Sequence, residues 1–163
     1  MAADIYAFLH LEGIQGEAQD SAYQNKIELN SFGWGASNNS SFQSGTGPSV
    51  SKGQIHDISF SKFTCQASLR LLERAVSGKP VPKGTLTLCK LVGDKKIPYF
   101  EIDMDHVCVT SYQLSACSDG QLPHESGTIH FVKVKTKYKP QGNEGDASGH
   151  VDFGWDLQKN ESC

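Results

Sequence analysis

Six histidines are the residues of this chain best suited to bind a metal ion: His10, His56, His106, His124, His130 and His150. Any two of them are at least six residues apart, whereas zinc sites usually place two ligands within about five residues of each other. Three of them fall on expected strands and could still converge in space. We interpret the histidines as hydrogen-bonded or exposed side chains, and we assign no metal ligand.

Two pairs of aspartates could act as a general acid and base. Asp103 and Asp105 share one face of an expected strand, as do Asp152 and Asp156. Polar strand faces produce such pairs routinely. The sequence contains no Gly-x-Ser-x-Gly elbow, no phosphate-binding glycine loop before a helix and no Cys-x-x-Cys pair. We therefore assign no catalytic and no cofactor-binding residue.

Four lysines alternate along one expected strand, at Lys133, Lys135, Lys137 and Lys139. Such a row could bind an acidic partner. Lysines on a strand also keep a solvent face soluble or protect an exposed sheet edge, and we prefer that interpretation.

Cysteines give no sign of a disulfide framework. The five of them are odd in number and unclustered, which favours reduced thiols. Cys163 ends a polar tail, residues 158–163, and could pair between chains, although an inert terminal thiol is the simpler interpretation.

Size and charge favour one soluble globular domain over residues 1–163. The net charge of −3 argues against a nucleic-acid binder, which would be basic. The first residues lack the basic start of a signal peptide, and no apolar run reaches the length of a membrane span. We expect no membrane insertion.

One segment has a helical period, residues 65–77. Cys65, Leu69, Leu72 and Val76 recur at helical spacing, which predicts that this stripe is buried. Thr64 or Ser68 could cap the start and Gly78 the end. The substitution Leu72→Arg is then expected to unfold the chain.

The remaining sequence predicts roughly eight strands, as in a sandwich or barrel. Alternation of apolar residues places them at about 4–12, 26–36, 55–63, 84–92, 97–114, 124–139 and 151–157. A phase change is expected at Asp105–His106, where one strand continues past a bulge. Residues 38–53 are too polar to pack on themselves, and they predict an exposed loop.

Several collinear motifs resemble one family. They are Asp4-Ile5-Tyr6, Leu11-Glu12-Gly13-Ile14-Gln15-Gly16-Glu17, Ser31-Phe32-Gly33-Trp34-Gly35, Ile58-Ser59-Phe60-Ser61-Lys62, Tyr138-Lys139-Pro140-Gln141 and Gly154-Trp155-Asp156-Leu157. Together they cover nearly the whole chain, and the sequence resembles the haemolysin-coregulated protein (Hcp) family, the tube subunits of bacterial type VI secretion systems.

The resemblance implies a mainly β fold in which two antiparallel sheets form a barrel with one α-helix packed beside it. It also implies homohexameric rings that stack into a tube. The tube carries secreted effectors in its lumen, is tipped by a spike protein and is surrounded by a contractile sheath. Such a protein stays in the cytoplasm until firing and is then secreted.

The resemblance also suggests assembly residues. The candidates for ring stacking lie in the exposed loop: Ser44, Gly45, Thr46, Gly47, Pro48, Ser49, Val50 and Ser51. The candidates for the contact between subunits are Arg70, Glu73 and Arg74 on the helix, with Phe32 and Trp34 on an early strand.

Two other classes of protein stay open. A monomeric ligand-binding β-sandwich could use the aromatic side chains of Tyr6, Phe8, Phe32 and Trp34. A hydrolase could use Asp103 and Asp105 with a histidine. Solution mass distinguishes the first from a ring, and activity loss in Asp103→Asn or Asp105→Asn tests the second.

Overall fold

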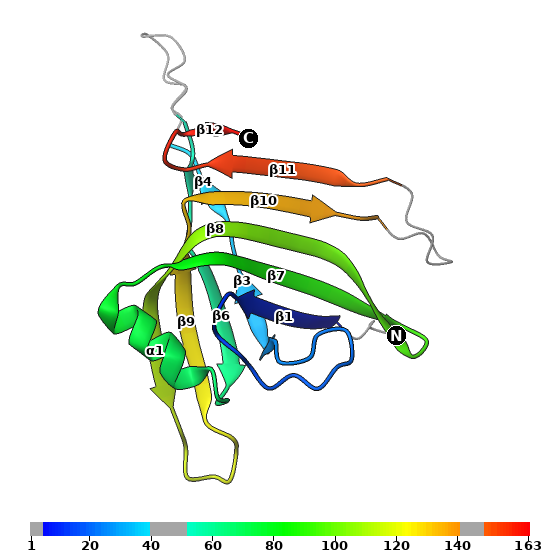
Figure 1. The fold of residues 1–163 in the computed structure, drawn as a ribbon, viewed down its shortest axis with the longest axis vertical. Helices are drawn as coiled ribbons and strands as arrows, with labels where there is room; N and C mark the ends of the chain where they lie inside the picture. Colours follow the sequence, from blue (N-terminus) through cyan, green and yellow to red (C-terminus); the bar gives the residue numbers. More distant parts are fainter. Residues whose placement is uncertain (1–4, 40–51, 141–148) are drawn as a thin grey trace.

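Twelve β-strands and one α-helix make up the fold in the computed structural model, which describes residues 5–39, 52–140 and 149–163 (Figure 1). In chain order the elements are β1 (Ile5–Leu11), β2 (Ile27–Leu29), β3 (Ser31–Gly33), β4 (Ala36–Ser37), β5 (Gln54–Ile55), β6 (Ile58–Phe63), α1 (Ser68–Ser77), β7 (Val81–Val92), β8 (Lys95–Ser115), β9 (His124–His130), β10 (Lys133–Tyr138), β11 (Val151–Asp156) and β12 (Glu161–Ser162). The mainly β prediction with one helix is confirmed.

Strand β8 joins the two main sheets, because its first half pairs with β7 and β10 and its second half pairs with β9. The first sheet has the order β12-β11-β10-β8-β7-β1-β2, and the second runs β8-β9-β6-β3. All these pairs are antiparallel. Strands β4 and β5 form a separate pair.

The predicted barrel is not confirmed. Strands β2 and β3 follow each other along the chain at the open ends of the two sheets, and the amide of Asn30 donates to the carbonyl of Ser61 at 2.8 Å across that gap. Over the described residues, β2 does not pair with β6 or β3 as a strand, so neither sheet closes on itself.

The phase change predicted at Asp105–His106 is confirmed. His106 has φ 53°, a left-handed conformation that shifts the alternation of buried residues from Ile102 and Met104 to Val107 and Val109. The change lets one strand present an apolar face to the core in both sheets.

Three predicted strands are wrong in extent. Residues 55–63 break at His56–Asp57, between β5, which pairs with β4, and β6 in the second sheet. The other two are broken where the chain passes from one main sheet to the other. Residues 26–36 break at Asn30, and residues 124–139 break at Phe131–Val132. A passage between sheets turns the chain, so a short strand in each sheet replaces one long strand. The break at Asn30 also brings Phe32 and Trp34 to the same core as Ile27 and Leu29.

One main core lies between the two sheets and includes side chains from β1, β6, β8, β9 and α1. A smaller cluster lies on the outer face of the first sheet, where Phe8 stacks on Tyr23 with ring centroids 4.6 Å apart and interplanar angle 4°. The second apolar face of β1 is therefore covered by a segment of the same chain.

Helix α1 turns a different face to the core from the one predicted. Ala67, Ser68 and Leu71 are buried, whereas Leu69 is 72% exposed and Val76 is 82% exposed. The stripe at helical spacing is real, but most of it faces away from the core, and Leu72 is only half-buried. Gly78 ends the helix as predicted, with φ 69°, while the N-cap is Ala67 and makes no side-chain capping bond.

The described residues contain no helix long and apolar enough to cross a membrane.

Candidate assembly site

A buried ion pair lies where α1 begins. The ammonium of Lys62 on β6 lies 2.6 Å from Oε2 of Glu125 on β9, and both side chains are fully buried. The same ammonium donates to Oγ of Ser68 at 3.0 Å and to the carbonyl of Phe63 at 2.9 Å. All three ammonium protons therefore have acceptors, which offsets part of the cost of removing the charge from water.

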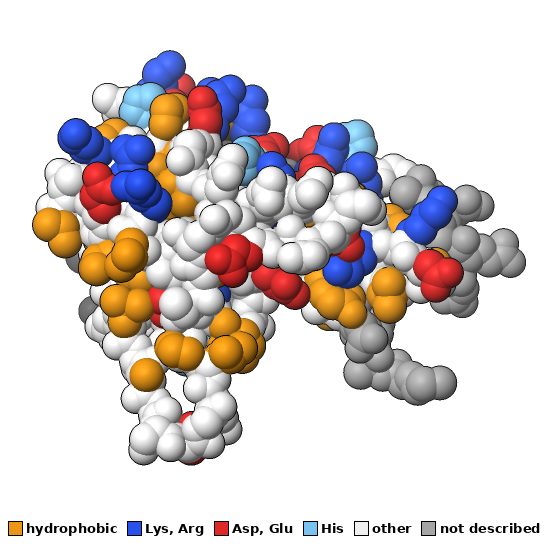
Figure 2. Space-filling view, turned by 60° about the horizontal axis from the view of Figure 1, so that its bottom comes forward, with side chains coloured by type: hydrophobic (Ala, Val, Ile, Leu, Met, Phe, Trp, Pro, Cys, Tyr) orange, Lys and Arg blue, Asp and Glu red, His pale blue; other side chains and the backbone are white. Residues whose placement is uncertain are grey.

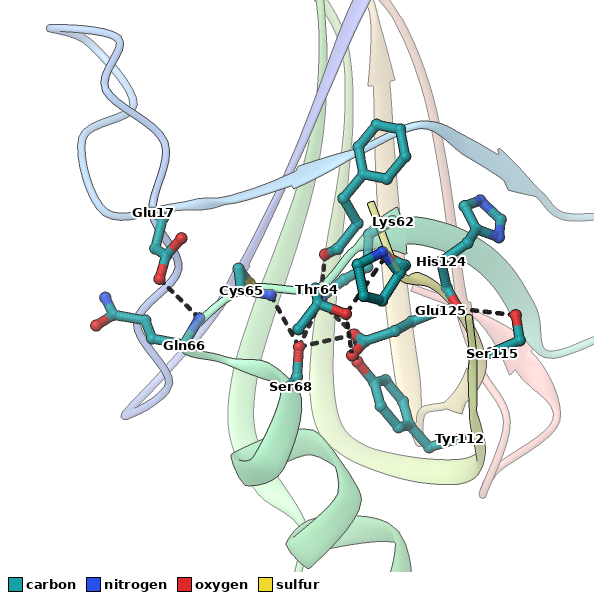
Figure 3. Close-up of polar contacts among 12 residues, drawn as sticks. Glu17, Lys62, Thr64, Cys65, Gln66, Ser68, Tyr112, Ser115, His124 and Glu125 are labelled. Atoms are coloured by element: carbon teal, nitrogen blue, oxygen red, sulfur yellow. Dashed lines mark hydrogen bonds and ion pairs between the residues drawn. The ribbon is translucent and has the colours of Figure 1, made fainter. Parts of the chain in front are cut away.

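The carboxylate of Glu125 accepts hydrogen bonds from side chains of four elements or loops (Figure 3). Besides Lys62, Ser68 donates to it at 2.7 Å and Thr64 at 3.1 Å, and the hydroxyl of Tyr112 on β8 also donates to it. Burial alone would raise the pKa of Glu125, but the hydrogen bonds from Lys62, Tyr112 and Ser68 lower it below its ordinary value. The carboxylate is therefore held in its charged form.

The same cluster raises the pKa of Tyr112, because the phenol is buried and donates to the carboxylate. Ser68 also accepts a hydrogen bond from the amide of Cys65 at 3.0 Å, and the amide of Gln66 donates to Glu17 at 3.0 Å (Figure 3). The contact of Gln66 joins the segment before α1 to the loop between β1 and β2. The cluster therefore fixes the position of α1 against the second sheet.

The candidates Arg70 and Glu73 lie on the exposed side of α1. Their side chains form an ion pair at 3.1 Å and are 71% and 62% exposed. Arg74 is half-buried and donates to the carbonyl of Pro80 at 3.5 Å. Exposed pairs of this kind contribute little to folding, about 0–1 kcal/mol. Folding of the single chain therefore depends little on the pair of Arg70 and Glu73, and both side chains are exposed enough to contact another molecule.

The candidates Phe32 and Trp34 are half-buried against the main core of their own chain. The indole of Trp34 meets the ring of Phe131 edge-on, with centroids 6.2 Å apart, and its N–H donates to the carbonyl of His56 at 3.1 Å. They are not brought together with Arg70, Glu73 and Arg74, which lie on α1. Part of each aromatic ring stays exposed. A contact of Phe32 and Trp34 with another subunit therefore stays a prediction.

The lysine row faces acidic residues on both neighbouring strands. Lys135 lies opposite Asp103 on β8, and Lys137 lies between Glu101 on β8 and Asp152 on β11. Lys133 is likewise flanked by two aspartates. The outer face of the first sheet thus alternates in charge, so the row is no uniform basic surface for an acidic partner.

Asp103 and Asp105, the hydrolase candidates, belong to this charged face. Asp103 is exposed and accepts a hydrogen bond from Thr85 at 3.0 Å. Within the described ranges, no group of three histidine, cysteine, aspartate or glutamate side chains could hold a metal ion. A shallow hollow of about 390 Å³ lies between β8, β10 and β11, and it is lined mainly by these charged side chains.

Sequence reasoning missed a polar cluster on the second sheet. Asp57 accepts from Thr110 at 2.9 Å and pairs with Nδ1 of His130 at 2.7 Å. In this cluster the carboxylate of Asp57 is the central group, and the contact that His130 makes is with Asp57, not with the hydroxyl of Thr110. The Lys62–Glu125 pair was missed as well. Lys62 continues the apolar face of Ile58 and Phe60 on the same strand, and this position was the signal that could have indicated it.

The stacking candidates Ser44 to Ser51 lie outside the described residues.

Comparison with known proteins identifies the family of this fold. Residues 8–138 match the family model described as "Type VI secretion system effector, Hcp". Protein hcp1 of Pseudomonas aeruginosa is 29% identical over 161 residues, covering 98% of this chain and 98% of that protein. A solved type six secretion system protein has a TM-score of 0.92 and 31% identity, over 98% of this chain and 100% of that one. The crystal structure of Hcp1 from Salmonella typhimurium has a TM-score of 0.78 and 25% identity, over 98% of this chain and 99% of that one.

Proposed function

Since this chain belongs to the Hcp family of type VI secretion tube proteins, we propose that it forms homohexameric rings that stack into the inner tube. The supporting observation is the match over the full length of a solved type six secretion system protein, with a TM-score of 0.92. A family of secreted tube proteins performs its role by assembly, and we assign this chain a structural, non-enzymatic role.

The partners follow from the same role. The ring lumen would carry effectors, a spike protein would tip the tube, and a contractile sheath would surround it. The chain would remain in the cytoplasm until contraction and then enter the medium or a target cell.

Electron microscopy of the purified chain tests the ring. We expect six-fold rings with a central hole. Particles without a central hole at every protein concentration would contradict the proposal.

A deletion tests the stacking loop. Residues Ser44 to Ser51 are polar and rich in glycine and serine, so their removal should not disturb a hydrophobic core. We expect the deleted chain to form rings but few stacks. A matched control replaces the same eight residues with an alternating Gly-Ser segment of equal length. Long tubes from the deleted chain would contradict the role of the loop in stacking.

A further inference from the structure

The first sheet is covered by the second along only part of its inner face. Along β10 the exposed fraction rises from 0% at Val134 to 9% at Thr136 and 42% at Tyr138. The register places Trp155, Phe153 and Val151 of β11 directly opposite these residues, and Phe153 is 47% and Val151 64% exposed.

The same gradient occurs on β1 and β8. Ile5 is 60% exposed, although Leu9 on the same face of β1 is fully buried. Phe100 is half-buried and lies opposite Tyr138, whereas Ile102, the next residue on its face, is fully buried. We call the exposed residues at this end, together with the half-buried Phe100, the apolar overhang: Ile5, Phe100, Tyr138, Val151 and Phe153.

The sequence next to the overhang contains few large apolar side chains. Residues 141–148, Gln-Gly-Asn-Glu-Gly-Asp-Ala-Ser, contain no large apolar side chain, and residues 1–4 contain only Met1. A cluster of exposed apolar side chains usually marks a surface that contacts another molecule.

A second exposed apolar surface lies on α1. Leu69, Leu72 and Val76 follow one another at helical spacing on the side turned away from the core, and we call them the helix stripe. Figure 1 places α1 at the lower left and the ends of β1, β10 and β11 that carry the overhang at the right. On the face drawn in Figure 2, hydrophobic side chains extend from the left to the lower centre, and a smaller group lies toward the right.

Two different apolar surfaces at opposite ends of a subunit suit a head-to-tail contact. A two-fold contact pairs a surface with itself, so it would cover one surface and leave the other in water. A head-to-tail contact covers both, and it closes into a ring when the rotation per subunit fits.

We infer that the helix stripe of one copy covers the apolar overhang of the next copy around the ring. The inference rests on the proposed ring and names the two surfaces that would form it.

Two charge substitutions test the pairing. Val76→Glu alters the helix stripe and Val151→Glu the overhang, at side chains that are 82% and 64% exposed in the single subunit. Each variant alone should be monomeric by light scattering, with the circular dichroism spectrum of the unchanged chain. An equal mixture should form one-to-one dimers and no rings, because one intact stripe and one intact overhang remain.

Leu122→Glu is the control. Leu122 is 68% exposed and lies in the loop between β8 and β9, outside both surfaces. Its rings should persist. Rings from either test variant would overturn the pairing, and so would dimers formed by one variant alone. If the unchanged chain is itself monomeric, the proposed ring fails rather than the choice of surfaces.

Photo-crosslinking tests the pairing without a charge substitution. A photoreactive phenylalanine analogue at position 76 should crosslink to peptides from residues 133–139 or 149–157 of a second copy. Crosslinks confined to other peptides would overturn the inference, even if Val76→Glu failed to fold.

Discussion

At the residue scale, the buried pair of Lys62 and Glu125 is the polar feature on which folding depends most. Each charge is fully buried and satisfied by the other and by neighbouring hydroxyls. Removing one partner leaves the other charge buried without a counter-charge. Replacing a whole buried pair with apolar groups is often close to neutral in stability.

Lys62→Met should therefore lower the free energy of unfolding by about 3–5 kcal/mol. The double variant Lys62→Met/Glu125→Leu should recover a large part of that loss, because no buried charge remains. Urea unfolding at several protein concentrations measures both, since the concentration series separates folding from subunit association. Equal losses in the single and double variants would show that the pair has no special role.

The pH dependence of stability reports on the same carboxylate. Its folded pKa lies below the unfolded value of about 4.3, so the folded state binds fewer protons than the unfolded state between the two values. The contribution of Glu125 should be complete above about pH 5 and should be lost as the pH falls through the folded pKa. The difference in unfolding free energy between the unchanged chain and Glu125→Gln should shrink below about pH 4. A constant difference down to pH 2 would contradict this assignment.

At the element scale, the direction of α1 separates the sequence prediction from the structure. Leu71, which is fully buried, is the core residue of the helix, and the predicted core residue Leu72 is half-buried. Leu71→Ala should lower the free energy of unfolding by about 2–5 kcal/mol. Leu72→Ala should lower the free energy of unfolding clearly less than Leu71→Ala. Urea unfolding of both variants at the same set of protein concentrations measures the difference. A larger loss of stability in Leu72→Ala than in Leu71→Ala would show that the face predicted from the sequence is the buried one.

The reason for that error is physical. The sequence offers two apolar stripes on one short helix: the larger side chains of Leu69, Leu72 and Val76, and the smaller set of Ala67, Leu71 and Ala75. Size favours the first, but the single chain buries the second, where small residues allow close approach to the sheet. Periodicity alone cannot tell a core face from a face that contacts another subunit.

The lysine row also belongs to this scale. The double variant Lys135→Glu/Lys137→Glu places like charges opposite Asp103, Glu101 and Asp152. Cross-strand charge pairs contribute about 0.2–1 kcal/mol each, so we expect a loss near 1 kcal/mol that weakens at high salt. Rings should remain by electron microscopy, since the row is on neither proposed contact surface. Loss of rings without loss of folding would place the row in an interface.

At the scale of the whole molecule, alternation of apolar residues predicted most strands, because strands that cover a core must alternate. The breaks at Asn30 and at Phe131–Val132 were not predicted, although the apolar alternation changes parity at both, from Ile27 and Leu29 to Phe32 and from Phe131 to Val134. Nor could alternation predict the Lys62–Glu125 pair, whose members are 63 residues apart. The assembly surfaces stay predictions: the sequence suggested α1 as a candidate, whereas the overhang depends on how far one sheet covers the other, which alternation does not show.

The central claim is that this chain assembles into a ring of six copies. Size-exclusion chromatography with multi-angle light scattering measures the mass in solution directly. We expect a single species of six times the subunit mass of 17.7 kDa, with larger species where rings stack. A monomer at every concentration would contradict the claim.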